Sequence, residues 1–246
     1  MPISANTLFH FTRNYDTLLS ILKSKFYPRL CLEQKIVPIL DLRLAIPMVC
    51  FCDIPLSQIS EHSLKYGEYA IGIKKNWAIK QGVSPILYVH ENSLILNTVL
   101  SEIKSVSEDV LKNPEGDASS KMKKFVDTVC MMKPYEGYDD RVGKSIRFYD
   151  EREWRYVPSR EKDDQFLYLT EAVFKEEGAR EKINYENEKY GVEFNPDVIN
   201  YLIVATDKDV LTLKRAIEEI KGGFSYNSVQ LLMTKIISME RIREDF

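Results

Sequence analysis

The sequence has few of the side chains that metal and redox sites need. Among its 246 residues are 4 cysteines and 3 histidines, and the cysteines (Cys31, Cys50, Cys52 and Cys130) lack the paired spacings of zinc sites. Cys50 and Cys52 flank Phe51, so in a strand both thiols lie on one face as small hydrophobic groups. We therefore predict no metal site and reduced, structural cysteines, as in a cytoplasmic protein.

Three further absences narrow the class of protein. No apolar run approaches the length of a membrane span, and the N-terminus lacks a basic segment leading into an apolar stretch, so we expect no membrane contact. The formal net charge is −3, which gives no overall basic surface for nucleic acid but is compatible with a local groove. No glycine-rich loop joins a strand to a helix, which argues against P-loop and Rossmann nucleotide sites.

The segments that are present predict an α+β fold with a mixed sheet. From about residue 93 to 133, two amphipathic segments flank a polar break, which predicts a helical insertion in a single domain covering 1–246. Strand candidates lie on both sides of this block, which favours a mixed sheet over a doubly wound one. Strands are predicted at 7–12, 46–52, 68–74, 85–89, 146–157, 201–205 and 230–237, and helices after Asn14 or Asp16, at 57–65, at 75–80 and from Thr206 or Asp207 to Gly222.

The predicted strand at 146–157 carries the most informative pattern. Alternation of side chains along a strand places Glu151, Glu153 and Arg155 on one face. Two carboxylates two residues apart repel each other, so a sequence that needs only a stable sheet would rarely choose this face. One interpretation, the commoner for an arbitrary sequence, is a solvated face on which Glu153 pairs with Arg155. The other is a catalytic carboxylate held on a rigid strand.

Two other segments stand apart from their surroundings. His10 lies in an apolar strand, where a histidine is more often a core residue than a functional one. His62 and Tyr66 are four residues apart, so on a helix they line one surface, and Tyr69 follows at the start of a strand. The alternative for the second segment is an ordinary helix-to-strand turn at Gly67. No nucleophile elbow accompanies these residues, so the sequence does not support a Ser-His-Asp triad.

The order of the motifs 8–12, 49–57, 62–73, 149–157 and 234–246 resembles the AbiGi family of bacterial abortive phage-infection proteins, which has been described as an antitoxin family. This resemblance covers nearly the whole chain except the helical block. A strand with His-aromatic-Thr, a middle tyrosine and a late strand with glutamate is also remotely similar to ADP-ribosyltransferases of the DarT-like and His-Tyr-Glu types. The second resemblance implies an ADP-ribosyltransferase-like fold with NAD as co-substrate.

The transferase resemblance assigns the NAD contacts to four residues. His10 is expected to hydrogen-bond the NAD ribose, with Thr12 supporting the same strand end. Tyr66, or Tyr69 in its place, is expected to stack on the nicotinamide ring, a use of an aromatic face that gives orientation without charge. Some enzymes of this type also place an arginine in the NAD pocket, and for that position we consider Arg13. Arg29 is the second arginine considered.

The same resemblance assigns the chemistry to the two carboxylates. Glu153 is expected to bind the nicotinamide-ribose hydroxyl and to stabilise the oxocarbenium-like transition state as nicotinamide leaves. Glu151 is expected to orient or deprotonate the acceptor. On this interpretation, the Glu151–Glu153 spacing, which is unfavourable for the stability of a sheet, is explained by its use in a catalytic site.

Three functions remain open at this point. The first is a phage-defence toxin that transfers ADP-ribose from NAD to a nucleic-acid or protein acceptor, and that needs a cognate antitoxin or chaperone. The second is a non-catalytic antitoxin that binds a partner in a toxin–antitoxin system. The third is a nuclease or hydrolase that uses Asp53, Glu151 and Glu153 around a divalent metal. We predict docking of the toxin's partner on the helical block 93–133, from its amphipathic pattern.

Overall fold

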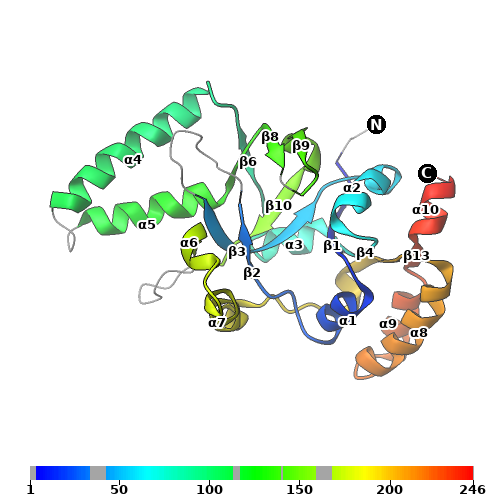
Figure 1. Ribbon diagram of the computed structural model, residues 1–246. Coiled ribbons are helices and arrows are strands. Elements are labelled where there is room, and N and C mark those ends of the chain that lie inside the picture. Colours follow the sequence, from blue (N-terminus) through cyan, green and yellow to red (C-terminus); the bar gives the residue numbers. More distant parts are fainter. Residues whose placement is uncertain (1–3, 34–42, 113–116, 140, 159–167, 246) are drawn as a thin grey trace.

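A computed structural model describes residues 4–33, 43–112, 117–139, 141–158 and 168–245. It confirms the predicted α+β class, with a large mixed sheet and helices on both of its faces (Figure 1). The strands of the main sheet are β1 (Thr7–Thr12), β2 (Arg29–Leu32), β3 (Leu44–Cys52), β4 (Tyr69–Lys74), β5 (Ser84–Pro85), β10 (Glu153–Tyr156), β11 (Leu169–Thr170), β12 (Ile199–Val204) and β13 (Ile236–Ser238).

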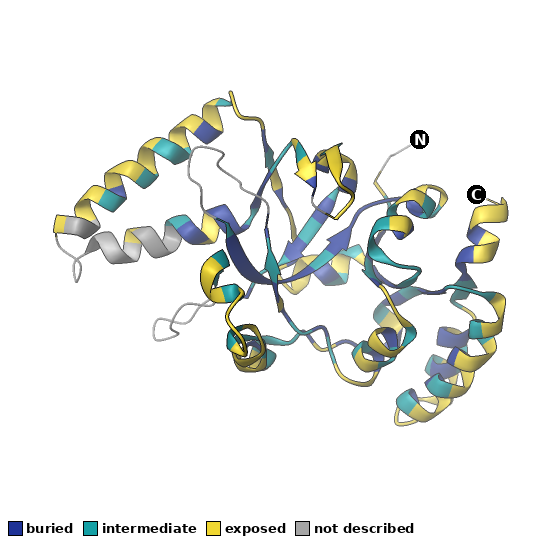
Figure 2. Cartoon of the chain, in the orientation of Figure 1, coloured by how far each residue is buried: buried dark blue, intermediate teal, exposed yellow. Residues whose placement is uncertain are grey.

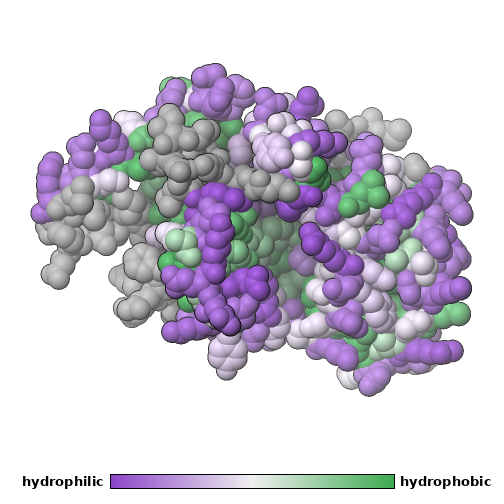
Figure 3. Space-filling model, in the orientation of Figure 1, coloured by the Kyte–Doolittle hydropathy of each residue, from purple (hydrophilic) through white to green (hydrophobic). Residues whose placement is uncertain are grey.

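The sheet is built around β3, whose continuous apolar sequence suits a strand that is covered on both faces. Its strands pair in the order β13-β12-β4-β1-β3-β10-β5, and β2 and β11 also pair with β3. The β12–β13 pair is parallel and the other pairs are antiparallel. Figure 2 shows that buried residues concentrate in these strands while the outer surfaces of the helices are exposed. In the same orientation, hydrophilic residues predominate on the described surface over the helices (Figure 3).

Two small sheets lie beside the main one. Strands β6 (Leu87–Val89) and β7 (Met132–Pro134) pair in parallel, and β8 (Glu136–Asp139) and β9 (Lys144–Arg147) form an antiparallel hairpin. The first pair joins the chain before the helical insertion to the chain after it. It thereby carries Lys133 back toward the main sheet, where this residue is buried.

The helices and helical turns connect and cover these strands. Their bounds are α1 (Tyr15–Lys23), η1 (Leu56–Gln58), α2 (Ile59–Tyr66), α3 (Lys75–Lys80), α4 (Leu94–Lys112), α5 (Asp117–Cys130), η2 (Phe148–Glu151), α6 (Glu171–Phe174), α7 (Ala179–Glu186), η3 (Asn187–Tyr190), η4 (Pro196–Val198), α8 (Asp207–Lys221), α9 (Tyr226–Met233) and α10 (Met239–Asp245). The segment predicted as a helical insertion forms the α4–α5 hairpin, which extends away from the sheet in Figure 1. None of the helices in the described ranges combines the length and the apolar character required to cross a bilayer.

Strand residues alternate between the two faces of the sheet, so both faces carry apolar side chains that helices can cover. On one face α1, α8 and α9 bury Leu18, Leu213 and Leu232 against the sheet. On the other face α2 and α10 bury Ile59 and Ile242. The caps follow the predicted signals: Asn14 Oδ1 accepts from the backbone N–H of Thr17 at the start of α1, and Thr206 caps α8, which ends before Gly222.

Two predicted strands are wrong, and a third, 85–89, divides at Ile86 into β5 and β6, which belong to different sheets. The segment 146–157 is not one strand, because η2 and a left-handed Arg152 (φ 47°) separate β9 from β10. The segment 230–237 combines the end of α9 with β13. There Val229, Leu232 and Met233 are buried at helical spacing, so the helical period decides the local structure.

The sheet opens between β1 and β3. Strand β1 pairs with β4 along its whole length, from Thr7 to Thr12, whereas its described pairing with β3 is the one position Phe9–Cys52. On the other side of β3, β10 continues the ladder from Glu153 to Tyr156. The side chain of His10 bridges the opening, because its Nδ1 lies 2.7 Å from the carbonyl oxygen of Cys50. Sheet openings of this kind expose side chains of two strands to one space.

Candidate functional site

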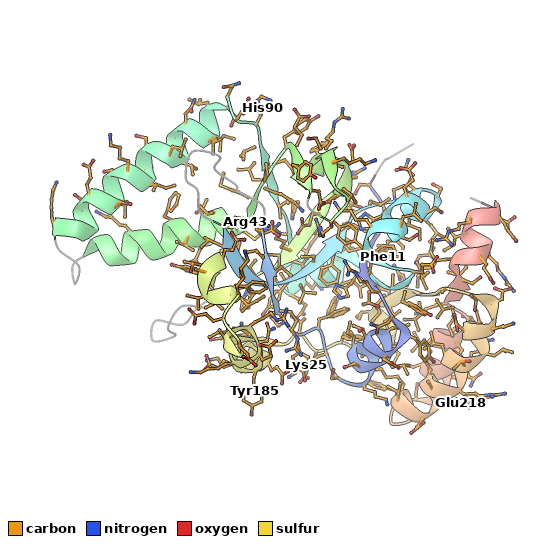
Figure 4. All side chains as sticks on the ribbon, viewed as in Figure 1. Phe11, Lys25, Arg43, His90, Tyr185 and Glu218 are labelled. Carbon is orange, nitrogen blue, oxygen red and sulfur yellow. The ribbon has the colours of Figure 1, made fainter. Side chains whose placement is uncertain are left out.

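A cavity of about 310 Å³ lies at this opening, and we name it the inner cavity. Its volume is at the lower end of the usual range for small-molecule sites, about 300–1,000 Å³. Phe11 and Arg43, labelled in Figure 4, belong to its lining from β1 and from the segment before β3. The lining residues are Phe9, His10, Phe11, Cys31, Leu32, Glu33, Arg43, Cys50, Phe51, Cys52, His62, Tyr66, Lys133, Arg141, Glu151 and Glu153.

The two carboxylates reach the inner cavity from different elements. Glu151 ends η2 and Glu153 begins β10, and each is 7% exposed. Arg152 between them is the non-glycine residue with positive φ in the described chain, and its left-handed conformation turns the backbone out of the strand path. The predicted strand face therefore does not exist, but the backbone turn still brings Glu151 beside Glu153.

Lys133 holds the two carboxylates together. Its Nζ lies 2.6 Å from Glu151 Oε2 and 2.8 Å from Glu153 Oε2. Burial alone would lower the pKa of Lys133, but the charges of Glu153, Glu33 and Glu151 outweigh it and raise the pKa well above its usual value. Lys133 is therefore a fixed cation, and its charge cancels the repulsion that the Glu-x-Glu spacing creates.

Arg155 supplies the second fixed cation. It is fully buried, and its guanidinium contacts Glu153 Oε1 at 2.6 Å, Glu33 Oε2 at 2.5 Å and the carbonyl oxygen of Cys130 at 2.8 Å. The Glu153–Arg155 pair of the first interpretation thus forms, but it is buried rather than solvated. Burial raises the pKa of Glu153, but Arg155 and Lys133 outweigh it and hold that pKa well below the usual range.

Glu151 is fixed by a further set of donors. Its Oε1 accepts a hydrogen bond from the hydroxyl of Tyr66 at 2.6 Å and pairs with Lys65. Lys65 also lies 2.6 Å from Asp139 Oδ2, and Asp139 pairs with Arg141 at 2.9 Å. Burial would raise the pKa of Glu151, but Lys133 and Lys65 lower it. Both carboxylates are consequently ionised at neutral pH, and their lowered pKa values make them weak proton acceptors.

His10 and Tyr66 both line the inner cavity, as do Glu151 and Glu153, so the structure brings together four of the six predicted site residues. Burial lowers the pKa of His10, although its hydrogen bond to Cys50 opposes this, and the neutral ring donates that hydrogen bond from Nδ1. The roles toward NAD that the resemblance assigns to these residues stay predictions.

The structure does not bring Thr12 and Tyr69 to the inner cavity. The two residues face each other in the β1–β4 ladder, and Thr12 Oγ1 donates to the carbonyl oxygen of Asn14 at 3.2 Å. Tyr69 packs edge-to-face on Tyr15, in the core on the α1 side of the sheet. Alternation along β4 sends the Tyr69 ring to that core, whereas Tyr66 lies on α2 and turns the other way.

The two arginines considered for the NAD pocket also lie elsewhere. Arg13 is exposed, and Arg29 pairs with Glu188 at 3.0 Å. The arginines that line the inner cavity are Arg43 and Arg141. Neither has a local sequence signal, because both reach the cavity from irregular segments.

The three acids of the metal-dependent hypothesis do not come together. Asp53 pairs with Lys75 at 2.8 Å and accepts from Ser4 at 2.7 Å, and it lines neither the inner cavity nor the groove described below. Within the described ranges, no group of three or more His, Cys, Asp or Glu side chains has the arrangement of a metal site. The nuclease hypothesis therefore loses its predicted ligand set.

A second, open depression adjoins the inner cavity, and we name it the outer groove. Its volume is about 1050 Å³, and it runs between α2 and the segment from β9 to Arg152. His62, Tyr66 and Glu151 line both spaces, so the two are neighbours at these residues. The lining residues are Ile54, Ser57, Gln58, Ser60, Glu61, His62, Lys65, Tyr66, Lys144, Ser145, Ile146, Arg147, Tyr149, Asp150, Glu151 and Arg152.

His62 and Tyr66 form the boundary between the two spaces. As predicted for residues four apart on a helix, they lie on one surface of α2, with stacked rings whose centroids are 4.5 Å apart. Phe11 of β1 packs on His62 at 5.0 Å. Burial lowers the pKa of His62 to about 4, so the ring is neutral at pH 7.

Comparisons with known proteins give one consistent result. A family model described as "Putative abortive phage resistance protein AbiGi, antitoxin" matches residues 24–205. A curated relative, abortive phage resistance protein AbiGi of Lactococcus lactis subsp. cremoris, is 27% identical over 224 residues, covering 82% of this chain and 89% of the relative. No solved structure gives a significant match, so the predicted ADP-ribosyltransferase-like form of the sheet remains a prediction.

Proposed function

The chain belongs to the AbiGi family, and from this membership we propose that it acts in abortive phage resistance as an antitoxin-type component. Such a protein binds a toxic partner and restrains it, without turning over a substrate itself. The description of the family names an antitoxin, which agrees with the second of the three predicted functions better than with the transferase.

One observation of the site carries this proposal. Each of the four carboxylate oxygens of Glu151 and Glu153 already accepts from a donor within the chain. The donors are Lys133, Arg155, Tyr66 and Lys65, and the first two are almost completely buried. A carboxylate that stabilises a developing cation acts best when a fixed cation does not already neutralise it. Glu151 and Glu153 are thus part of an internal ionic network, and this arrangement supports the proposal that the chain binds a partner.

A growth experiment in cells that carry the gene neighbourhood of this chain tests the proposal. We expect deletion of the chain to impair growth, because its partner is released, and a plasmid copy of the wild type to restore growth. Glu153→Gln should restore it as well whenever the variant folds, and overproduction of the chain alone should leave growth unchanged. Growth arrest by the wild-type chain alone, abolished in Glu153→Gln, would instead identify a toxin.

Because Glu153 is a member of a buried ion network, its replacement also affects folding. Tyr66→Phe serves as the milder variant, since it removes one hydrogen bond to Glu151 and keeps all ion pairs. The thermal unfolding of each variant is measured beside its growth phenotype. A Tyr66→Phe protein that is folded but no longer restores growth would also contradict a purely structural role for this site.

A second candidate function is the transfer of ADP-ribose from NAD, and a separate observation favours it. His10, Tyr66, Glu151 and Glu153 line one cavity, at the place where the sheet opens between β1 and β3. A charged network that borders a cavity is more typical of a functional site than of a core, because buried ion pairs contribute little net stability. In this function Lys133 and Arg155 would keep Glu153 ionised at the NAD ribose.

Nicotinamide release from NAD by the purified protein tests this candidate, with RNA, DNA and cell lysate as acceptors. The transferase predicts release by the wild type and a loss of about 10²–10³-fold in Glu153→Gln, the usual effect of removing one electrostatic stabiliser. Calorimetric titration with NAD separates binding from turnover. Absence of both binding and release in every mixture would leave the antitoxin as the function.

A further inference from the structure

The outer groove has an unpaired strand edge as one wall. Strand β9 pairs with β8 on one side, and within the described chain no strand pairs with its other side. All four residues of β9, Lys144, Ser145, Ile146 and Arg147, line the groove. Consecutive residues of a strand point to opposite faces. Because the groove contacts all four residues of β9, it runs along the edge of this strand. An edge of this kind presents backbone N–H and C=O groups that a further strand can pair with.

The size and the opposite wall of the groove leave room for such a strand. Its volume of about 1050 Å³ is slightly above the range for small-molecule sites, about 300–1,000 Å³, and the groove is open to solvent. The wall across from β9 comes from η1 and α2 and includes two small hydroxyl side chains, Ser57 and Ser60, beside longer polar residues of the same elements. The groove therefore suits a segment of polypeptide in extended conformation, the arrangement known as β-augmentation.

The charges along the edge indicate what kind of segment fits. Lys144 and Arg147 stand at the two ends of β9 and are exposed, although the whole chain has a net charge of −3. Arg147 pairs with Asp150 at 3.8 Å, but both side chains are more than half exposed, so this contact is weak. Another acidic residue that lines the groove, Glu61, lies on the opposite wall rather than on the β9 edge. The edge itself thus has two positive charges for the backbone and side chains of an acidic segment.

Charged residues on an edge strand also have a simpler use, since lysine on such an edge discourages aggregation. The position of β9 favours the docking function. The groove ends at Glu151, His62 and Tyr66, which also line the inner cavity, so a segment along β9 would cover the entrance to that cavity. Protection from aggregation does not require an edge to border a groove, nor a groove to adjoin a charged cavity.

We propose that the partner of this chain docks by adding an extended, acidic segment as a further strand along β9 in the outer groove. This inference rests on the proposed antitoxin function and names the surface and the partner chemistry that it uses. Electrostatic complementarity at such an edge selects the partner and speeds encounter, while main-chain hydrogen bonds to β9 hold it.

Reversal of the two edge charges tests the proposal in the growth experiment described above. We expect Lys144→Glu/Arg147→Glu to lose the ability to restore growth, whereas Lys144→Arg/Arg147→Lys retains it. The matched control is Lys214→Glu/Arg215→Glu on α8, which makes the same change of charge at exposed positions away from the groove. Equal restoration by the β9 reversal and the control overturns the docking site. Failure of the wild type to restore growth overturns the proposed function instead.

A photo-crosslinking residue in place of Ser145 identifies what lies on the edge. The expected product is a crosslink to a protein, at a segment with net negative charge, that Lys144→Glu/Arg147→Glu reduces at least about tenfold. Thermal unfolding of the purified variants shows whether the β8–β9 hairpin is intact in each. A crosslink to a basic segment overturns the proposal. A product that nuclease removes also overturns it, because it shows that the edge binds nucleic acid.

Discussion

Replacement of Lys133 by methionine is expected to lower the free energy of unfolding by about 3–5 kcal/mol, the usual loss when one partner of a buried ion pair is removed. Lys133 is 4% exposed and contacts both Glu151 and Glu153. Methionine retains most of the volume of the side chain, so little of the loss would come from packing. The two buried carboxylates would then repel each other without the cation between them. Urea unfolding of both proteins at pH 7 measures the difference.

The pH dependence of this loss distinguishes electrostatics from packing. In the wild type, the pKa values of Glu151 and Glu153 are lowered, so their contribution to stability is complete above the ordinary glutamate pKa of about 4.3 and is lost as the pH falls below it. In Lys133→Met, burial and repulsion raise these pKa values, so protonation begins at a higher pH and relieves the repulsion. The difference in stability between the two proteins should therefore be smaller at pH 5 than at pH 7.

An exposed lysine supplies the control for both measurements. Lys214 lies on the outer surface of α8, and Lys214→Met is expected to change stability by no more than about 0.5 kcal/mol at either pH. If Lys133→Met costs the same at pH 5 and pH 7, the loss comes from packing and the network is not electrostatic. If it costs no more than Lys214→Met, the three charges are not in contact.

The sequence predicted the part of the site that depends on local spacing. His62 and Tyr66 share a surface because they are four apart on a helix, and this is confirmed. The convergence of His10 with Glu153 followed from a resemblance in motif order rather than from spacing, and the open sheet explains it. Strand alternation was a poor guide around Arg152, because one left-handed residue changes the direction of the chain and carries no sequence signal unless it is glycine.

The cations of the network show why the remainder of the site was not predicted. Lys133 follows the α4–α5 hairpin and reaches the carboxylates through the parallel pairing of β7 with β6, a long-range contact without a local pattern. Alternation within β10 correctly places Arg155 on the same face as Glu153, but the contact of Arg155 with Glu33 joins residues 122 positions apart. Burial of a charged triad is energetically unfavourable unless every member is paired, so the sequence alone gives no reason to expect one.

The choice between the two functions depends on this network. A core that needed only stability would gain as much from apolar residues of equal volume, so a buried charged network beside a cavity indicates a geometric requirement. The buried charged side chains of this network are Glu33, Lys133, Asp139, Glu151, Glu153 and Arg155. In an antitoxin, the network fixes η2 and β10, which carry Tyr149, Asp150 and Arg152 to the wall of the outer groove. In a transferase, it fixes Glu153 at the inner cavity. The same charged network thus positions residues of the outer groove and residues of the inner cavity.

Replacement of Gly67 by alanine is the second change with a large expected effect. Gly67 follows α2 with φ 112°, and an added Cβ would lie 2.1 Å from the carbonyl oxygen of Thr12 and 2.5 Å from the Cα atom of Arg13. These are backbone atoms, so the clash is relieved only if the end of α2 moves away from the end of β1. That movement would separate Tyr66 from Glu151 and widen the boundary between groove and cavity.

Gly82 provides a control, because its φ is also positive, at 84°, and no atom would lie within 4 Å of its added Cβ. Gly82→Ala is therefore expected to lower the free energy of unfolding only by the cost of the positive φ, about 1–3 kcal/mol. Gly67→Ala should exceed this loss by a further ~1–3 kcal/mol, the usual cost of overpacking. Denaturant unfolding of both variants gives the difference. Equal losses would mean that α2 and β1 are farther apart than described, and His62 and Tyr66 would then not be held against the inner cavity by this contact.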